Sequence, residues 1–349
     1  REAGDAVEVA RREVAALLGA QAREVVFTSG ATESNNTALK GAAHFHARHF
    51  GKRPLVTVAS EHKCVLESCK RLEAEGFEVT YLPVHPNGRI DPDALRAAIR
   101  DDTAIVSVMA VNNETGVIQD TAAIGAICRE RGVLFHTDAA QAAGKIPLDL
   151  NAAQVDLLSL SGHKLYGPKG VGALYMRRRP RARIDALMDG GGQERGMRSG
   201  TVPAPLAVGL GEACRIARDE LDAEHARLTH LQQRLRAGLE TAIPDLGING
   251  DLDHRIPGNL NVTVPGLDAE TLIENLDGIA VSTASACSSA SVEPSYVLTA
   301  MGLSDEAAAA SLRIGLGRFT TEAEVDAAVR ELTATAQRLR AAGASRLAV

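Results

Sequence analysis

Short runs of β-branched and other apolar residues alternate with helical stretches from residue 24 to residue 176. An alternation of this kind is typical of a mostly parallel sheet with helices on both faces. The expected strands are 24–28, 55–58, 78–82, 104–108, 134–137, 157–160 and 173–176. The pattern therefore predicts an α/β core.

Turn and cap residues mark the ends of the intervening helices. Asp91 followed by Pro92 predicts an N-cap with Pro in the first turn, and Gly76 and Gly132 stand where a left-handed residue ends a helix. The chain itself opens in a predicted helix over 5–18. Because it starts at Arg1 rather than Met and within that helix, we expect that a natural N-terminal segment is missing.

The pattern changes after Pro203. A long charged helical stretch reaches about residue 239, short strands follow near 259–264 and 311–316, and a last helix covers about 322–339. A chain of 349 residues also exceeds the size at which one hydrophobic core stops growing. We therefore expect a large α/β domain over 1–220 and a small α+β domain over 221–349, with the long helix as a bridge between them.

Composition and charge indicate which kinds of partner and which cellular compartment to expect. The hydrophobic fraction of 45% and the charged fraction of 23% are ordinary for globular proteins, and a net charge of -6 without a basic stripe argues against a nucleic-acid partner. Five scattered cysteines argue against a disulfide framework and for a reducing compartment. No apolar run of about 18 residues and no leader is visible, so we expect a cytoplasmic protein without a membrane partner.

Polar residues follow several predicted strands at their carboxyl ends, where ligands bind in open α/β sheets. The small-residue turn 28–35 runs into a helix, and backbone N–H groups there, with the Thr32 hydroxyl, would cradle a phosphate. An ordinary Ser/Thr-rich helix cap is the alternative. A Walker motif is absent, because Gly144 and Lys145 are followed by Ile146.

Two of these strand ends carry charged residues. Asp138 follows the strand 134–137 and could hold a ring nitrogen in its protonated form, or it could simply cap a helix. Lys164 follows the strand 157–160 and has Ser161 and His163 beside it, as either a Schiff-base lysine or an ordinary surface lysine. An Asp and a Lys at the ends of separate strands form the electron-sink arrangement of enzymes that use pyridoxal 5'-phosphate (PLP).

With these residues the chain resembles the class V aminotransferase-like PLP enzymes, and among them the cysteine desulfurases of the NifS/IscS type. The resemblance covers nearly the whole chain and is carried by the blocks 24–34, 111–116, 161–164 and 318–321. It implies the PLP-dependent transferase fold type I, with PLP bound covalently to Lys164. Family members usually have a strand and a loop before the helix with which this chain opens.

The resemblance also implies roles around the cofactor ring. Lys164 would carry PLP as a Schiff base, and Asp138 would face the pyridine nitrogen. His62 would stack on the ring and assist proton transfers, although by itself it reads as an ordinary helix-start histidine. Gln141 and Asn113 would bond the ring oxygen, and Asn113 would also contact the substrate.

Further roles concern the phosphate and the substrate. Arg313 would clamp the substrate carboxylate with its guanidinium fork, and Arg318 is the competing candidate. Thr201 would reach the phosphate of a neighbouring subunit, which implies a homodimer. Within one chain the phosphate would be held by the Ala31 backbone, Thr32, Ser161 and His163.

Cys287 lies in the small-residue run 281–291, which lacks apolar periodicity and predicts a mobile loop. An exposed thiol on such a loop can both attack and deliver sulfur. The resemblance implies that Cys287 takes sulfur from L-cysteine as a persulfide, leaving L-alanine, and passes it to an iron–sulfur scaffold or another sulfur acceptor. Cys287 could also ligate a cluster transiently. The other cysteines fit buried small residues within helices: Cys64, Cys69, Cys128 and Cys214.

Two other classes of function are compatible with parts of this pattern. Another PLP reaction, such as selenocysteine cleavage, alanine transfer or aminotransfer, would also need Lys164 and Asp138, but a plain aminotransferase has no use for Cys287. A sulfur-trafficking or scaffold subunit that had lost catalysis would need neither Lys164 nor His62. The sequence therefore favours a PLP-dependent cysteine desulfurase.

Overall fold

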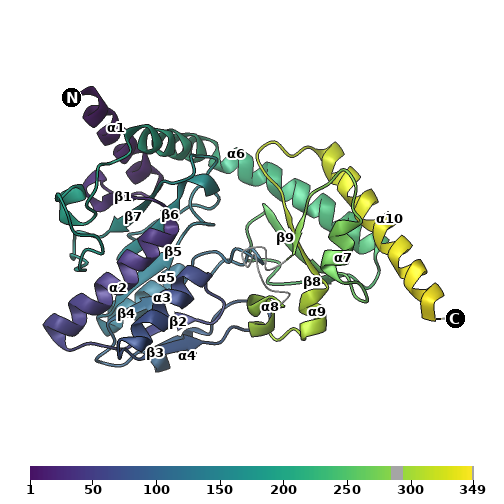
Figure 1. Ribbon diagram of the computed structural model, residues 1–349, viewed down its shortest axis with the longest axis horizontal. Coiled ribbons are helices and arrows are strands. Elements are labelled where there is room, and N and C mark those ends of the chain that lie inside the picture. Colours follow the sequence, from purple (N-terminus) through teal and green to yellow (C-terminus); the bar gives the residue numbers. More distant parts are fainter. Residues whose placement is uncertain (284–293, 348–349) are drawn as a thin grey trace. The chain divides into compact units, whose positions relative to one another are not determined.

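The computed structural model describes residues 1–283 and 294–347, the side chains of 343–347 excepted. The chain divides into two compact units, which are described separately (Figure 1). Unit 1 comprises Arg1–Pro83, Ile90–Asn112 and Ile118–Leu221, and unit 2 comprises Val84–Arg89, Asn113–Val117 and Asp222–Val349. Among the described residues, no helix has both the length and the apolar character needed to cross a membrane.

Unit 1 is built on a seven-stranded sheet with the strand order β1-β7-β6-β5-β4-β2-β3. Strand β7 runs antiparallel to its two neighbours, and the other adjacent pairs are parallel. The predicted mostly parallel α/β sheet is therefore confirmed. Its strands are β1 (Val25–Thr28), β2 (Leu55–Val58), β3 (Val79–Leu82), β4 (Ile105–Ser107), β5 (Leu134–Asp138), β6 (Leu157–Ser161) and β7 (Gly172–Met176).

Helices occupy most of the segments between these strands. Strands β1, β2, β4 and β6 are buried at every position, which explains why they read as continuous apolar runs rather than as alternating ones. The helices that belong to unit 1 are α1 (Glu2–Leu17), α2 (Ala31–Phe50), α3 (Lys63–Ala74), α4 (Pro92–Ala98) and α5 (Thr121–Arg131), with the 3-10 helices η1 (Ala22–Glu24), η2 (Gly162–Lys164) and η3 (Glu194–Gly196).

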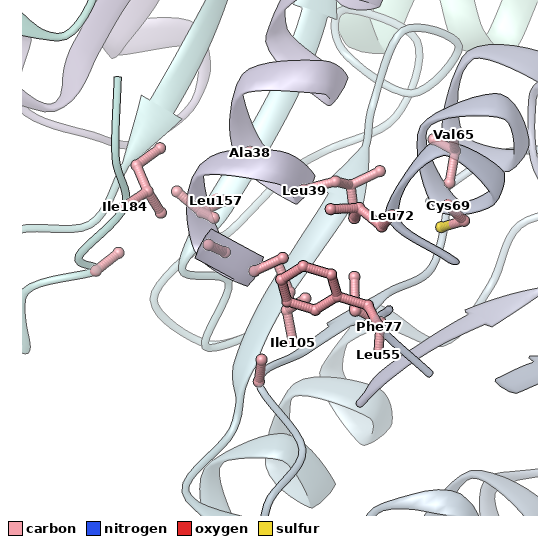
Figure 2. Close-up of a cluster of buried hydrophobic side chains, with 14 of the residues drawn as sticks. Ala38, Leu39, Leu55, Val65, Cys69, Leu72, Phe77, Ile105, Leu157 and Ile184 are labelled. Carbon is pink, nitrogen blue, oxygen red and sulfur yellow. The ribbon is translucent and has the colours of Figure 1, made fainter. Parts of the chain in front are cut away.

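A buried apolar cluster holds α2 and α3 against the sheet. Figure 2 shows Leu39 of α2 and Leu72 of α3 close to Phe77, with Leu55 of β2 and Ile105 of β4 beside them. All five side chains are buried. Because α2 and α3 follow β1 and β2 directly, this packing fixes the first turn of each helix at the carboxyl edge of the sheet.

The predicted helix ends are confirmed. The Asp91 side chain accepts a hydrogen bond from the Asp93 backbone N–H, and Pro92 occupies the first turn of α4. Gly132 ends α5 with a φ of 64°, and Gly76 has a φ of 86° after α3. Glycine adopts this left-handed conformation without steric cost.

Unit 2 contains a four-stranded antiparallel sheet with the order β10-β11-β9-β8. Helix α6 (Ala204–Ala242) contributes residues to both units. The last helix, α10 (Glu322–Leu347), runs past its predicted end at residue 339, because the alanines that follow favour a helix without an apolar stripe. The remaining elements are β8 (Gly247–Ile248), β9 (Asn259–Thr263), β10 (Ser282–Thr283), β11 (Ser311–Gly315), α7 (Ala269–Glu274), α8 (Tyr296–Ala300) and α9 (Asp305–Ala309).

A buried ion pair fastens the glycine-rich segment 190–201 to the rest of unit 1. Arg11 of α1 donates to both carboxylate oxygens of Glu194, at 2.6 and 2.8 Å, and to the Val25 carbonyl oxygen at 3.0 Å. Glu194 also accepts from the Phe27 N–H at 2.8 Å. Arg11 and Glu194 are 3% and 7% exposed. The pair therefore joins α1, β1 and η3 away from solvent.

Replacement of Glu194 should be costly, because it leaves the Arg11 charge buried without its main partner. We expect Glu194→Ala to lower the free energy of unfolding by about 3–5 kcal/mol. Glu8→Ala is the matched control, because Glu8 binds the same guanidinium from an exposed position, and it should cost less than about 1 kcal/mol. Urea denaturation measures both values, and equal losses would contradict a special role for the buried pair.

Candidate active site

The start of α2, called the anion cradle below, lies at the carboxyl edge of the unit 1 sheet. Gly30 links β1 to α2 with a φ of 152°, and no side chain caps this helix among the described residues. A Cβ added to Gly172 of β7 would lie 2.6 Å from the Gly30 Cα, and one added to Gly30 would lie 3.7 Å from the Ser161 Oγ. The backbone N–H groups of the first helical turn can therefore receive an anion beside a hydroxyl group.

The predicted phosphate residues Ala31, Thr32, Ser161 and His163 belong to this edge. Ala31 and Thr32 form the first turn of α2, next to Gly30. The Ser161 Oγ and the His163 Nδ1 are 3.1 Å apart. Burial lowers the pKa of His163, and the charges of Lys164 and Lys169 lower it further.

The glycine-rich segment is also tied to the first turn of α2. The Arg198 Nε donates to the Glu33 Oε1 at 2.9 Å, and the other oxygen of Glu33 accepts from the Ser29 N–H at 2.8 Å. Burial acts to raise the pKa of Glu33. The hydrogen bonds from Arg198 and Ser29 and the charge of Arg198 outweigh that effect and lower the pKa below its ordinary value. Thr201 lies exposed just after this anchor. Its predicted contact with a neighbouring subunit stays a prediction.

Asp138 is a buried carboxylate at the end of β5. Its Oδ1 accepts from the Ala140 N–H at 2.9 Å, and its Oδ2 accepts from the Asn35 Nδ2 at 2.6 Å. Burial raises its pKa, and the two hydrogen bonds and the positive charges of His62 and Lys164 oppose that rise. An ionised carboxylate in this position is therefore stabilised by a cationic partner.

His62 caps the first turn of α3. Its Nδ1 accepts from the Cys64 N–H at 3.2 Å, and the Cys64 Sγ is 3.0 Å away. Burial lowers the pKa of His62. The charge of Asp138 acts to raise it, and the charges of Lys164 and Lys63 lower it further. These electrostatic interactions show that the fold brings the predicted residues His62, Asp138 and Lys164 together. Lys164 lies exposed at the end of η2.

Three residues of this site have no role in the sequence prediction: Asn35, Glu61 and Cys64. Asn35 lies one helical turn after Thr32, a spacing that could have placed it on the same face of α2. Glu61 is fully buried beside His62, accepts from the Met109 N–H at 2.5 Å, and has a pKa well above its ordinary value through burial and the charge of Asp138. Burial and the charge of Asp138 therefore both favour the protonated form of the Glu61 carboxyl group.

The other predicted residues are distributed over both units. In unit 1 the Gln141 Oε1 accepts from the Lys145 Nζ at 2.5 Å, which leaves the amide N–H groups of Gln141 to serve an acceptor such as a ring oxygen. In unit 2 the Arg313 Nη1 donates to the Asn113 carbonyl oxygen at 3.1 Å, so these two candidates contact each other. The Asn113 Oδ1 is buried without a hydrogen-bond partner among the described residues.

Cys287 lies outside the described residues. The expectation for the other cysteines is correct for Cys69, Cys128 and Cys214, which are buried and whose thiol pKa values burial raises to about 12. It is incomplete for Cys64, which is only half-buried and contacts polar groups as well as the apolar cluster. Its position in the first turn of α3 exposes one side of it to the site.

The residues of unit 1 fit PLP at three points. The uncapped helix start and Ser161 suit a phosphate, the buried Asp138 suits a protonated ring nitrogen, and the Lys164 amine suits an aldehyde carbon. Among the described residues there is no cluster of three or more His, Cys, Asp or Glu residues that could hold a metal ion. The donor set therefore indicates an organic phosphate cofactor.

Comparison with known proteins agrees with this geometry. The family model described as aminotransferase class-V matches residues 1–328. A cysteine desulfurase of Pongo abelii is 56% identical over 97% of this chain and 74% of its own length. The cysteine desulfurase IscS of Rickettsia bellii is 54% identical over 97% of this chain and 82% of its own length.

Solved structures give the same result. A NifS-like protein superposes with a TM-score of 0.88 at 39% identity, covering 95% of this chain and 87% of its own. A structure of SspA in complex with cysteine superposes with a TM-score of 0.79 at 38% identity, covering 92% and 89%. This chain therefore belongs to the aminotransferase class-V family, and within it to the cysteine desulfurases of the NifS/IscS type.

Proposed function

We propose that this protein is a PLP-dependent cysteine desulfurase, which removes sulfur from L-cysteine and releases L-alanine. The observation that carries the proposal is the buried Asp138 carboxylate, which interacts with His62 and Lys164 at the same sheet edge as the anion cradle. The buried carboxylate would pair with the pyridine nitrogen of PLP, the amine with its aldehyde carbon, and the anion site with its phosphate. No feature of the described residues specifically favours the alternative activity, cleavage of selenocysteine.

Five groups of unit 1 would surround the cofactor. Bound PLP supplies an electron sink that stabilises negative charge on the substrate Cα. Asp138 would hold a proton on the pyridine nitrogen, because an opposite charge at short range favours the ionised form of each partner. The first turn of α2, with Ser161 and His163, would bind the phosphate, and the Gln141 amide would donate to the ring oxygen.

Lys164 and His62 would move protons. Lys164 lies exposed at the end of η2, where its amine, when neutral, would remove the proton from the substrate Cα. The lowered pKa of His62 keeps its imidazole neutral near pH 7, so that it can accept a proton as well as donate one. The two residues are therefore suited to successive proton transfers in one turnover.

Cys287 would receive the sulfur. Its thiolate would attack the sulfur of the substrate, a sulfur–sulfur bond would form, the bond from Cβ to sulfur would break, and the electron pair would pass to the substrate carbon skeleton, which takes up protons to leave alanine. The four described thiols have a pKa raised above the ordinary value by burial, so they do not supply a thiolate at neutral pH. Because the other four thiols are unsuited to this step, their raised pKa values support the role of Cys287.

Residues of unit 2 would select the substrate. Arg313 presents a planar guanidinium suited to a carboxylate, and its contact with the Asn113 carbonyl oxygen fixes its direction. Arg318 is a weaker candidate, because its guanidinium already binds Glu224 at 2.7–2.8 Å. L-Cysteine brings the single carboxylate that Arg313 would need.

The protein would act with partners. Thr201 at the end of the anchored glycine-rich segment would complete the phosphate site of a second copy, which supports a homodimer. The Cys287 persulfide would pass to an iron–sulfur scaffold or another sulfur-acceptor protein, and in such a complex Cys287 could ligate a cluster. The four described cysteines are free, in keeping with a reducing compartment, for which we propose the cytoplasm.

The assignment of Cys287 can be tested by separating cofactor binding from sulfur release. Purified wild-type protein should show the visible absorbance of bound PLP and should produce sulfide and alanine from L-cysteine in the presence of a thiol reductant. Cys287→Ser should keep the absorbance and lose at least about 99% of the sulfide release, because the nucleophile is gone. Cys69→Ser, which changes a buried thiol, serves as the control and should retain activity; full activity in Cys287→Ser would refute the persulfide step.

The charge on Asp138 can be tested with an isosteric change. Asp138→Asn preserves the shape of the side chain and removes its charge, so kcat should fall about 10²–10³-fold while PLP remains bound. Asp91→Asn, at the N-cap of α4, is the matched control because Asn caps helices as well as Asp does. Steady-state assays with absorbance spectra measure both effects, and an unchanged kcat in Asp138→Asn would exclude the proposed role.

A further inference from the structure

Cys64 lies between two groups of the proposed site. Its Sγ is 3.0 Å from the His62 Nδ1 and accepts from the Asn35 Nδ2 at 3.1 Å. The same Asn35 nitrogen donates to the Asp138 Oδ2 at 2.6 Å. A continuous path of hydrogen bonds therefore runs from the Asp138 carboxylate through Asn35 and Cys64 to the His62 ring.

The direction of each hydrogen bond follows from the groups involved. The Asn35 amide nitrogen carries two hydrogens, one for the Asp138 carboxylate and one for the Cys64 sulfur. The opposite amide orientation would set the Asn35 oxygen against the carboxylate, where both atoms are acceptors. The sulfur therefore receives a hydrogen bond on this side, and its own hydrogen remains to be donated.

The Cys64 thiol keeps that hydrogen at neutral pH. Burial raises its pKa to about 12, with a further contribution from the charge of Asp138. The S–H group can therefore donate to the His62 Nδ1, which also accepts from the Cys64 backbone N–H at 3.2 Å. Two donors on one ring nitrogen leave the proton of the neutral ring on the other nitrogen, Nε2.

We propose that Asn35 and Cys64 are positioning residues, which lock His62 in the tautomer protonated at Nε2 and tie its ring to the Asp138 carboxylate. The effect on catalysis rests on the proposed function, in which His62 contacts the cofactor. The hydrogen-bond path itself belongs to the folded chain.

The charge of His62 depends on the groups that face it. Asp138 from β5 favours the protonated ring, while Lys164 from η2 and Lys63 on α3 disfavour it. Glu61 precedes His62, and burial followed by the charge of Asp138 raises its pKa, which favours its neutral form. Burial favours the neutral ring of His62, and the Cys64 S–H and backbone N–H groups that donate to Nδ1 favour it further. Removal of the thiol hydrogen should therefore make protonation of His62 easier.

The test is nitrogen NMR of His62 in protein labelled with 15N-histidine. The spectrum of the wild type should show Nε2 protonated and Nδ1 unprotonated, with the His62 signal among ten histidines identified by its loss in His62→Gln. Cys64→Ala should raise the His62 pKa by about one unit, a tenfold change in the protonation equilibrium, and should lower kcat with little change in KM. Cys64→Ser, whose hydroxyl also donates and accepts, should retain the wild-type tautomer.

Cys69→Ala is the matched control, because Cys69 lies on the same helix, is buried, and is absent from the hydrogen-bond path. It should leave the His62 signals at their wild-type positions. The proposal is overturned if wild-type His62 carries its proton on Nδ1, if Cys64→Ala matches Cys69→Ala, or if Cys64→Ser behaves like Cys64→Ala. If the wild type binds no PLP and releases no sulfide, the proposed function fails, whereas the His62 spectra still decide the role of Cys64.

Discussion

The site depends on one buried negative charge. Asp138 ends the central strand β5 and is only 4% exposed, so burial raises its pKa, while hydrogen bonds from an N–H group and an amide, together with interactions with His62 and Lys164, oppose that rise. An ion in such surroundings is unstable without partners, so the fold has to bring donors and cations to it. The carboxyl edge of a parallel sheet does so, because β5 and β6 end side by side and the first turns of α2 and α3 follow strands of the same sheet.

Two ion pairs hold the same edge of the sheet. Arg11 and Glu194 join α1, β1 and η3 in the interior, and Arg198 and Glu33 connect the glycine-rich segment to the start of α2. Gly172 allows its strand to approach the backbone of Gly30, where a Cβ on Gly172 would collide, and Gly30 adopts a positive φ that side chains disfavour. These interactions fix the position of a helix start that no side chain of the described residues caps. The scaffold thus sets the geometry of this edge.

Much of this was predictable from local pattern. Apolar runs gave the seven strands of unit 1 to within one residue at each end, and cap residues such as Asp91 and Gly132 marked helix ends. Asp138 and Lys164 were recognisable because each follows a strand, where binding residues gather. Cys64 was harder to interpret, because its chain neighbours are those of an ordinary amphipathic helix. Its polar contacts come from Asn35, which is 29 residues away in the chain.

The sequence by itself determined the fold class, the order of the strands along the chain and the residue types available for chemistry, because these follow from hydrophobic periodicity and local caps. The tertiary structure alone decided which polar groups meet. Asn35 reaches Asp138 across 103 residues and Arg11 reaches Glu194 across 183, distances in sequence over which no local pattern operates. Burial, too, is a property of the packed chain, and it is burial that raises the pKa values of Asp138 and Cys64 and lowers that of His62.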